Sequence, residues 1–427
     1  MEDFTQVYAE IKKDRQIWKF CAYGFLKDLK FFEPYLLIYL IAAGLSLFQI
    51  GILYSIRAAI VYIFEIPSGI IADTYGKKKE LMACFTFYII SFVFYFIGAE
   101  FWIFSIAMIF FGLGEAFRSG THKAMILSYL EQKNWFMHKG FVYGRTRSFS
   151  LIGSSLSAFV SIIFVLSLPD LKWLFLLCII PYLLDFALIV SYPNSLDEQR
   201  ETELSMKGFF SSGYAKLKSI FSNQSLEKVL LSSSLYDSIF KTIKDYIQPI
   251  LVSLIITATA LGFADLTADQ TVKVYLGIIY GIFYIFSAYA SRNVYRLNAL
   301  APSYTLMSMF FDMMGAAALL LFIALKAKLT ILVVVVFFVL YILKDGRRPL
   351  FLDVCADHMS KDERATAMSV DSMLAALFMV VFGPLFGFIA DHFSIGILFL
   401  FIGILILVTN RFLALPAAQK SEHQVTF

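Results

Sequence analysis

The chain has 427 residues, of which 59% are hydrophobic and only 16% are charged. Soluble domains carry about 25% charged residues, so this composition excludes an ordinary soluble protein and indicates an integral membrane protein. The formal net charge of +4 is small, and we expect no nucleic-acid partner.

The predicted elements are apolar segments that recur along the chain in two sets. A helix that crosses a bilayer needs about 20 residues, and each segment is close to that length. The first set lies at 20–43, 51–72, 81–99, 102–126, 148–168 and 171–193, and the second at 230–258, 274–292, 303–325, 329–350, 366–390 and 395–415. We therefore predict an all-α integral membrane protein with twelve transmembrane helices. They form an N-terminal six-helix bundle (1–193) and a C-terminal six-helix bundle (229–427), joined by a cytoplasmic central loop (194–228).

Charge in the loops predicts the orientation. Lys and Arg concentrate in the loops on one side, which include Lys77, Lys139 and Arg292, and are scarcer on the other side. Loops rich in these residues stay in the cytoplasm, so we expect both termini and the central loop to be cytoplasmic. The first twenty residues lack an apolar core followed by a cleavage site, which predicts no signal peptide. We expect a multi-pass protein of the cell membrane, and more narrowly of a bacterial inner membrane.

Charged residues interrupt the first predicted span, where Lys30 and Glu33 precede Pro34. A shorter span that began at Phe31 would leave Lys30 at the membrane surface instead. The seventh span has the matching order Gln248-Pro249, and it cannot be shortened, because the apolar run after Pro249 is too short to cross a bilayer. This match favours the interior for Lys30 and Glu33. It also indicates that the two sets of spans are pseudo-symmetric repeats.

A motif follows the second span, where the chain reads Gly69-Ile70-Ile71-Ala72-Asp73-Thr74-Tyr75-Gly76-Lys77-Lys78-Lys79. This segment resembles the Gly-x-Leu-Ala-Asp-Arg-x-Gly-Arg-Lys loop signature of the major facilitator superfamily. The resemblance implies two six-helix bundles that rock about a midplane site, with this loop as a latch in the outward-open state. The alternative is a basic loop that only sets the orientation.

Each motif residue has a physical role that the sequence itself suggests. Gly69 allows close contact between helices, and Gly76 allows a tight turn. Asp73 can face a positive helix N-terminus, and Lys77 can pair with a carboxylate. We expect these four residues to act in gating. Arg57 and Glu65, two helical turns apart in the second span, are further candidates for gating or for structural pairing with neighbouring helices.

The remaining interior charges fall on the fourth, seventh, tenth and eleventh spans. The resemblance implies that the first, fourth, seventh and tenth spans line the cavity. The candidate residues are Glu115 and Arg118; the stripe Asp237, Lys241, Lys244, Asp245 and Gln248; Lys344 and Arg347; and Asp371. The members of the stripe share one face of an α-helix within about 100°. A charged side chain in hydrocarbon costs about 2.5–3.5 kcal/mol on insertion scales, so these residues indicate a hydrated cavity.

The mixture of charges predicts the class of substrate. Lys and Arg are as frequent as acids among the candidates, which suits a small organic anion or zwitterion better than a lipophilic cation. We expect substrate contacts from Lys30, Glu33, Arg118, Lys241, Lys244, Gln248, Lys344 and Arg347. Arg118 and Arg347, one in each half, are the favoured binders of a carboxylate or phosphate because a guanidinium is bidentate.

A carboxylate that moves between dry and wet surroundings can take up and release a proton. Glu33, Glu115, Asp245 and Asp371 are the candidates for proton coupling, and sodium coupling is the alternative. Two other functions remain open: a drug/proton antiporter and a membrane receptor or scaffold that does not transport. We expect no enzymatic activity, cofactor or metal site, because no nucleophile elbow, metal-ligand His pair or phosphate-binding glycine loop is present. We expect a monomer in the lipid bilayer.

Overall fold

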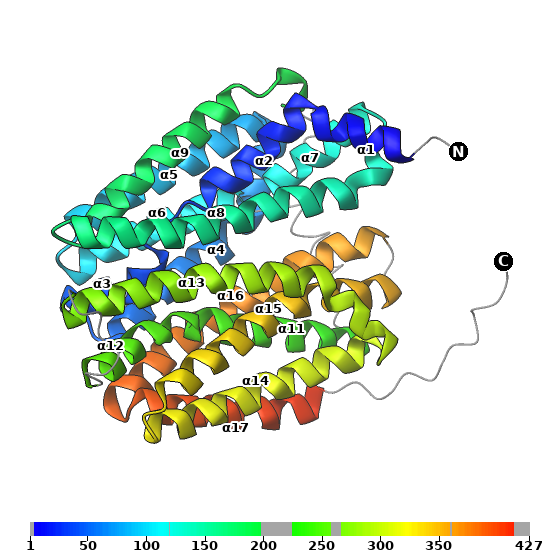
Figure 1. Ribbon diagram of the computed structural model, residues 1–427. Helices are drawn as coiled ribbons and strands as arrows, with labels where there is room; N and C mark the ends of the chain where they lie inside the picture. The colour runs from blue at the N-terminus through cyan, green and yellow to red at the C-terminus, as the bar shows by residue number, and fades with distance from the viewer. Residues whose placement is uncertain (1–3, 119, 198–223, 258–265, 359–360, 414–427) are drawn as a thin grey trace.

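The computed structural model describes residues 4–118, 120–197, 224–257, 266–358 and 361–413, and these ranges contain helices and no β-strand. The helices before residue 198 occupy the upper part of Figure 1, and those after residue 223 occupy the lower part. The first helix (Phe4–Lys13) and the end of the last helix (Ile395–Leu413) lie toward the same end of the molecule.

The helices of the first half range from 7 to 29 residues in length. They are α1 (Phe4–Lys13), α2 (Arg15–Lys27), α3 (Leu36–Ala42), α4 (Leu47–Tyr75), α5 (Lys77–Ile97), α6 (Phe101–Arg118), α7 (Thr121–Gln132), α8 (Lys139–Ser167) and α9 (Trp173–Val190). A 3₁₀ turn, η1 (Glu33–Tyr35), precedes α3. The α6 and α7 helices together correspond to the fourth predicted span, with Gly120 at positive φ between them.

The second half repeats this layout. Its helices are α11 (Gln224–Ile243), α12 (Ile247–Thr257), α13 (Ala268–Asn293), α14 (Ser303–Lys326), α15 (Thr330–His358), α16 (Lys361–His392) and α17 (Ile395–Leu413). A 3₁₀ turn, η4 (Lys244–Tyr246), separates α11 from α12, as η1 precedes α3 in the first half.

Nine helical segments among the described residues are long and apolar enough to cross a membrane, so the chain is a multi-pass membrane protein. The first, seventh and tenth predicted spans are not among them. The first and seventh are divided by 3₁₀ turns, and α15 carries Lys344, Asp345 and Arg347 in its course. The spans that fail this apolar criterion are therefore three of the four that were expected to line a polar cavity.

The prediction of one continuous seventh helix is wrong. The helix ends at Ile243 and restarts at Ile247, so Asp237 and Lys241 lie on α11 while Lys244 and Asp245 lie in the break. Pro249 lies in the first turn of α12, where its missing N–H is not needed, and a continuous helix would bring its ring against the carbonyl of Asp245. Pro34 lies within η1 itself, two residues before α3 begins.

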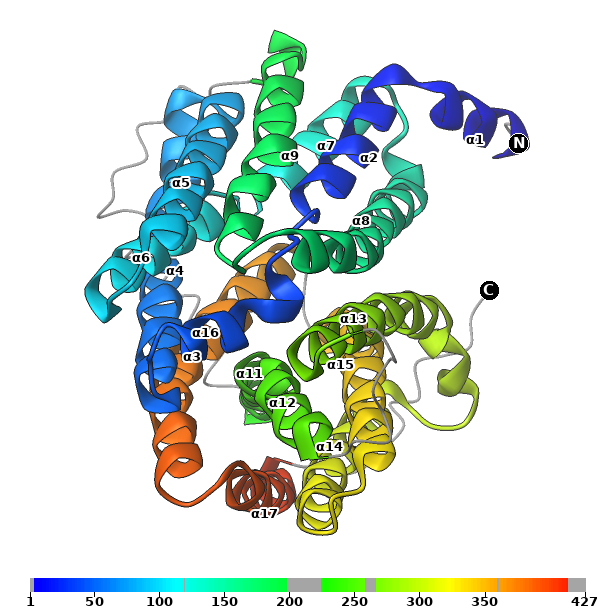
Figure 2. The same ribbon diagram turned by 60° about the vertical axis from the view of Figure 1, so that its left-hand side comes forward.

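The two halves pack closely at the end of the molecule away from the chain termini. There α4 lies against α16, and α8 lies against α13 (Figures 1 and 2). A Cβ on Gly51 would collide with the carbonyl of Gly383, and a Cβ on Gly387 would collide with that of Leu47, so only glycine fits. Asp391 of α16 also accepts hydrogen bonds from the first backbone N–H groups of α4, Leu47 N at 3.0 Å and Phe48 N at 2.7 Å.

Candidate functional site

The broken first and seventh spans meet at the centre of the molecule through an ion-pair cluster. Lys244 Nζ lies 3.1 Å from Glu33 Oε1 and 3.3 Å from Asp245 Oδ1. The side chains of Glu33 and Lys244 are 29% and 21% exposed, whereas that of Asp245 is 8% exposed. One ammonium group therefore joins an acid from each half, and solvent reaches the pair.

Gln248 connects the same two breaks through its side-chain amide. Its Oε1 accepts hydrogen bonds from Leu37 N at 2.8 Å and Ile38 N at 3.3 Å, and its Nε2 donates to the carbonyl of Glu33 at 3.1 Å. The Nε2 also donates to Tyr280 Oη, and the Tyr280 hydroxyl donates to Asp245 Oδ1 at 3.0 Å. Gln248 is fully buried, so its amide satisfies the backbone of the broken first span.

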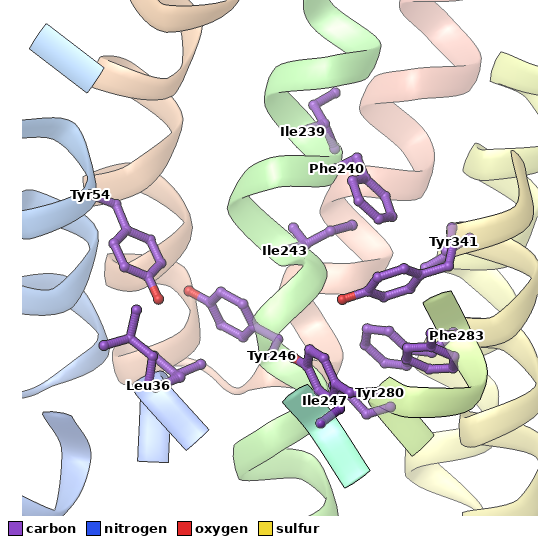
Figure 3. Close-up of a cluster of buried hydrophobic side chains, with 14 of the residues drawn as sticks. Leu36, Tyr54, Ile239, Phe240, Ile243, Tyr246, Ile247, Tyr280, Phe283 and Tyr341 are labelled. Atoms are coloured by element: carbon purple, nitrogen blue, oxygen red, sulfur yellow. The ribbon is translucent and has the colours of Figure 1, made fainter. Parts of the chain in front are cut away.

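Tyrosines lie around the break in the seventh span, and none of them was predicted from the sequence. Figure 3 shows the side chains of Tyr54, Tyr246, Tyr280 and Tyr341 arriving from three sides, with the hydroxyls of Tyr54 and Tyr246 directed toward each other. The hydroxyl of Tyr54 is buried and has no hydrogen-bond partner among the described residues. A sequence signal was present, since Tyr54 and Tyr280 occupy equivalent places after Gly51 and Gly277 in the two repeats.

A second ion pair lies beside the cluster in the first half. Arg57 Nε of α4 lies 3.6 Å from Glu115 Oε2 of α6, and the guanidinium also lies over the ring of Tyr54 at 5.2 Å. The partner of Arg57 is thus on a neighbouring helix rather than on its own. Glu65 lies further along α4, toward the end that carries the termini.

Three cations near the centre form no ion pair within the described part of the chain. Arg118 is partly buried, and its Nε donates to Tyr88 Oη at 3.2 Å. Lys30 lies over the ring of Phe111 at 5.8 Å. Lys241 is exposed, although its neighbours along α11 are buried. These cations come from the first, fourth and seventh spans.

The cations of the tenth span are arranged differently. Lys344 Nζ lies 2.8 Å from Asp345 Oδ1, which also lies 3.7 Å from Arg147 Nη2. Arg347 is 2% exposed, and it donates to Ser232 Oγ at 2.7 Å and to the carbonyl of Met307 at 3.2 Å. The two arginines that the sequence treats as equivalent are therefore not equivalent: Arg118 is partly accessible, and Arg347 is enclosed.

Asp371 of α16 pairs with a different cation. Arg348 Nη1 lies 2.9 Å from Asp371 Oδ2, and the Asp371 side chain is 2% exposed. All four carboxylates that were predicted to carry protons therefore have a cationic partner in this structure: Glu33, Glu115, Asp245 and Asp371.

The loop motif adopts the predicted turn. Gly76 has φ +103°, and its Cα lies against the carboxylate of Asp197, which accepts a hydrogen bond from Lys78 N at 2.8 Å. Lys77 Nζ lies 3.5 Å from Ser128 Oγ rather than beside a carboxylate. A Cβ on Gly69 would meet no described atom within 4 Å, so the expected close helix contact is not formed in this conformation. The side chain of Asp73 lies outside the described residues.

Basic side chains are exposed from the centre toward the end that holds the termini. Lys241 is exposed near the centre, and Lys123 and the Arg147 side chain, which is 54% exposed, lie further toward that end. The opposite end is closed by the glycine contacts of α4 and α16 and by the Ser155 hydroxyl of α8, which donates to the Gly281 carbonyl of α13 at 3.0 Å. The described residues contain no group of His, Cys, Asp and Glu that could hold a metal ion.

Comparisons with known proteins agree with this arrangement. Residues 28–343 match the family described as Major Facilitator Superfamily. The uncharacterized MFS-type transporter YxaM of Bacillus subtilis (strain 168) is 23% identical over 381 residues, which cover 88% of this chain and 89% of that protein.

Solved structures share the fold at low sequence identity. The nucleoside transporter NupG has a TM-score of 0.75 at 13% identity, covering 94% of this chain and 98% of that one. A POT family transporter in complex with 5-aminolevulinic acid has a TM-score of 0.67 at 13% identity, covering 93% of each chain.

Proposed function

The chain belongs to the major facilitator superfamily, and from that premise we propose that it moves a small anionic or zwitterionic organic solute by alternating access, coupled to protons. Its relatives support secondary transport rather than catalysis. In this proposal twelve spans form two six-helix bundles about the central cluster. Both termini face the cytoplasm, and the protein works as a monomer in the cell membrane.

The observation that carries the substrate class is the charge left over after internal pairing. Glu115 pairs with Arg57, whereas Glu33 and Asp245 share the single ammonium group of Lys244. Lys30, Arg118 and Lys241 form no ion pair among the described residues, and neither does the acid Asp237 of the seventh span. Partly buried charges usually pair, so Lys30 and Arg118, which are partly buried and unpaired, favour an anionic group on the substrate. Asp237 leaves a place for an ammonium group on a zwitterion.

Some residues of the site contact the substrate in this proposal, and others hold the structure around it. Arg118 is the main binder of the anionic group because it is accessible and its guanidinium makes bidentate bonds. Lys30, Lys241, Lys244 and Glu33 complete the polar surface, and Lys344 contributes from the tenth span. Arg347 and Gln248 hold the backbone and neighbouring side chains instead. The tyrosines around the cluster favour a substrate that also carries a ring or another flat group.

Alternating access in this proposal uses the asymmetry between the two ends. The glycine contacts of α4 and α16 close the outer side, and the loop motif is released on the open inner side. Gly69, Asp73, Gly76 and Lys77 close the inner side when the halves rock. The Arg57–Glu115 pair and Glu65 of α4 adjust with that movement, because α4 carries the loop at its end.

A thermal-shift screen of the purified protein tests the substrate class. The panel contains 5-aminolevulinic acid, dipeptides, nucleosides, nucleoside monophosphates and organic acids, each acid paired with its neutral amide, together with hydrophobic cations. We expect acids or zwitterions to raise the melting temperature while their neutral amides do not. Stabilisation by hydrophobic cations alone would replace the proposal with the drug/proton antiporter.

Three alanine variants test whether Arg118 is the residue that binds the anionic group of the solute. Arg118→Ala should weaken binding about 10- to 150-fold, because a hydrogen bond to a charged group contributes about 1.5–3 kcal/mol. Arg347→Ala should instead lower the melting temperature of the unliganded protein, since it leaves buried polar groups without partners. Arg411→Ala, at the exposed end of α17, is the matched control and should do neither. Equal loss of binding in all three variants would contradict the assignment.

A further inference from the structure

Asp185 is a buried acid that the central site does not use. It lies on α9, within the sixth predicted span, and it is 0% exposed. Neither carboxylate oxygen has a hydrogen-bond partner among the described residues, and no cation forms an ion pair with it there. Among the acids discussed above, Glu33, Glu115, Asp245, Asp345 and Asp371 all have a cationic partner.

Tyr182, one helical turn before Asp185 on α9, donates its hydroxyl to the Lys27 carbonyl at 2.9 Å, so α9 brings Asp185 close to the end of α2. The ammonium group of Lys27 already has partners. Lys27 Nζ lies 2.6 Å from Asp28 Oδ2 and 3.0 Å from Ser150 Oγ, and Asp28 is also hydrogen-bonded to Ser150. Five titratable groups interact electrostatically with Asp185: Tyr23, Lys27 and Asp28 from the first span, Cys84 from α5, and Tyr192 after α9. These groups include one cation, Lys27, and one other carboxylic acid, Asp28.

An ionised carboxylate in this place would be strongly unfavourable. Water no longer stabilises the charge of a buried carboxylate that has no partner, so such a group holds a proton instead. The Tyr23 hydroxyl is also buried without a partner among the described residues. A protonated Asp185 has an O–H to donate, which an ionised carboxylate lacks.

We propose that Asp28 and Asp185 are alternative partners of the Lys27 ammonium, and that the carboxyl group which Lys27 leaves carries a proton. In this conformation Lys27 pairs with Asp28, and Asp185 is the protonated acid. When Lys27 moves to Asp185, the Asp185 proton leaves to solvent and an Asp185–Lys27 ion pair forms. Asp28 is then free to bind a proton from solvent, so that each exchange moves one proton and no other bond changes.

The position of Lys27 ties this exchange to the movement of the protein. Lys27 is the last residue of α2, and Asp28 is its C-cap, directly before the break that leads to Glu33. The side chains of Lys27 and Asp28 are 17% and 15% exposed, so solvent reaches them while Asp185 stays dry. In this proposal, a movement of the backbone at the break on substrate binding shifts the Lys27 ammonium from Asp28 to Asp185. The link to transport rests on the proposed function, but the protonation of Asp185 does not.

Infrared spectroscopy of the purified protein in lipid nanodiscs tests the proposal without any substrate. A protonated carboxyl group gives a C=O band that an ionised carboxylate lacks. The wild type at neutral pH should show this band, and Asp185→Asn should remove one component of it. Asp28→Asn should remove the same component, because Lys27 becomes free to pair with Asp185. Asp345→Asn is the matched control, since Asp345 pairs with Lys344 and Arg147, and it should leave the component intact.

Three results would overturn the proposal. One is the absence of a protonated-carboxyl band from the wild-type protein at neutral pH. This result is measured on the wild type alone, so it does not depend on the folding of any variant. Another is a band that Asp185→Asn or Asp28→Asn leaves unchanged in protein that elutes as a folded species. The third is loss of the same component in Asp345→Asn. None of these results depends on whether the chain transports an anion, so failure here is distinct from failure of the proposed function.

Discussion

At the scale of single residues, the structure separates side chains that hold the protein together from side chains that are free to meet a solute. The side chain of Gln248 forms hydrogen bonds with backbone N–H and carbonyl groups, and that of Arg347 donates to a backbone carbonyl and a serine hydroxyl. Arg118 and Lys241 are accessible cations near the same centre. Residue type alone does not make this distinction, because both kinds of side chain are polar groups on spans that line the site.

Gln248→Ala should destabilise the fold rather than only weaken binding. The change leaves the Leu37 and Ile38 N–H groups and the Glu33 carbonyl without their partner, and each unsatisfied buried group costs about 1–3 kcal/mol. We expect a clear fall in the melting temperature of the unliganded protein. Gln132→Ala is the control, since its amide donates to the Ser195 carbonyl at an exposed site. Equal melting temperatures for the two variants would show that Gln248 has no such structural role.

At the scale of elements, the breaks in the first and seventh spans are the main feature. Each break lies next to a proline, but Pro67, Pro181 and Pro384 lie inside helices that continue through them. A proline alone is therefore not enough to divide a span here. In the first span, backbone groups that the break leaves without helical hydrogen bonds bond to Gln248 instead. This stabilises the break in a membrane, where unsatisfied backbone groups are unfavourable. The breaks place Glu33 and Lys244 side by side.

Pro249→Ala should lengthen the helical structure at the seventh-span break. Alanine restores an N–H and removes the ring that would meet the Asp245 carbonyl in a continuous helix. We expect slower amide hydrogen exchange over 243–249 and weaker binding of the acids found in the screen, because the Glu33–Lys244 pair is displaced. Pro384→Ala, in the continuous helix α16, should change neither. Unchanged exchange at 243–249 would mean that Pro249 does not maintain the break.

At the scale of the whole molecule, the N-terminal and C-terminal halves are in contact at one end and apart at the other. This arrangement is one conformation of a protein whose halves move relative to each other. The closed end depends on backbone contacts at Gly51, Gly383 and Gly387, where no side chain fits. The open end exposes basic side chains from both halves, among them Lys123, Arg147 and Arg348. Like charges facing one another disfavour closure, and an anionic solute between them reduces that repulsion.

Gly383→Val should open the closed end. Its side chain would meet the Gly51 carbonyl and the Ser55 hydroxyl, so α4 and α16 must separate. We expect a cysteine introduced at Ile50, which is 2% exposed, to react faster with a polar maleimide in this variant. Gly396→Val is the control at the same end, because its nearest contacts are at 3.7 Å. Equal labelling rates in both variants would contradict the closure by these glycines.

Sequence reasoning predicted the family and the multi-pass helical fold, because apolar length and the Gly69–Lys79 motif are local signals. It also selected Glu33, Lys244 and Arg118 as interior charges. It did not predict that Lys244 pairs with Glu33, because that contact joins residues 211 positions apart. The break at Lys244 was missed for a related reason: its stability depends on Gln248 and on packing between the halves. The enclosure of Arg347 likewise depends on Ser232 and Met307 of other helices.

Uptake into proteoliposomes tests the central claim most directly. The solute is the acid or zwitterion that stabilises the purified protein most, and the driving force is a pH gradient across the vesicle membrane. The account predicts accumulation by the wild type, collapse of accumulation when an ionophore removes the gradient, and at least about a tenfold loss of uptake in Arg118→Ala. Binding without any movement of the solute, or uptake confined to hydrophobic cations, would contradict it.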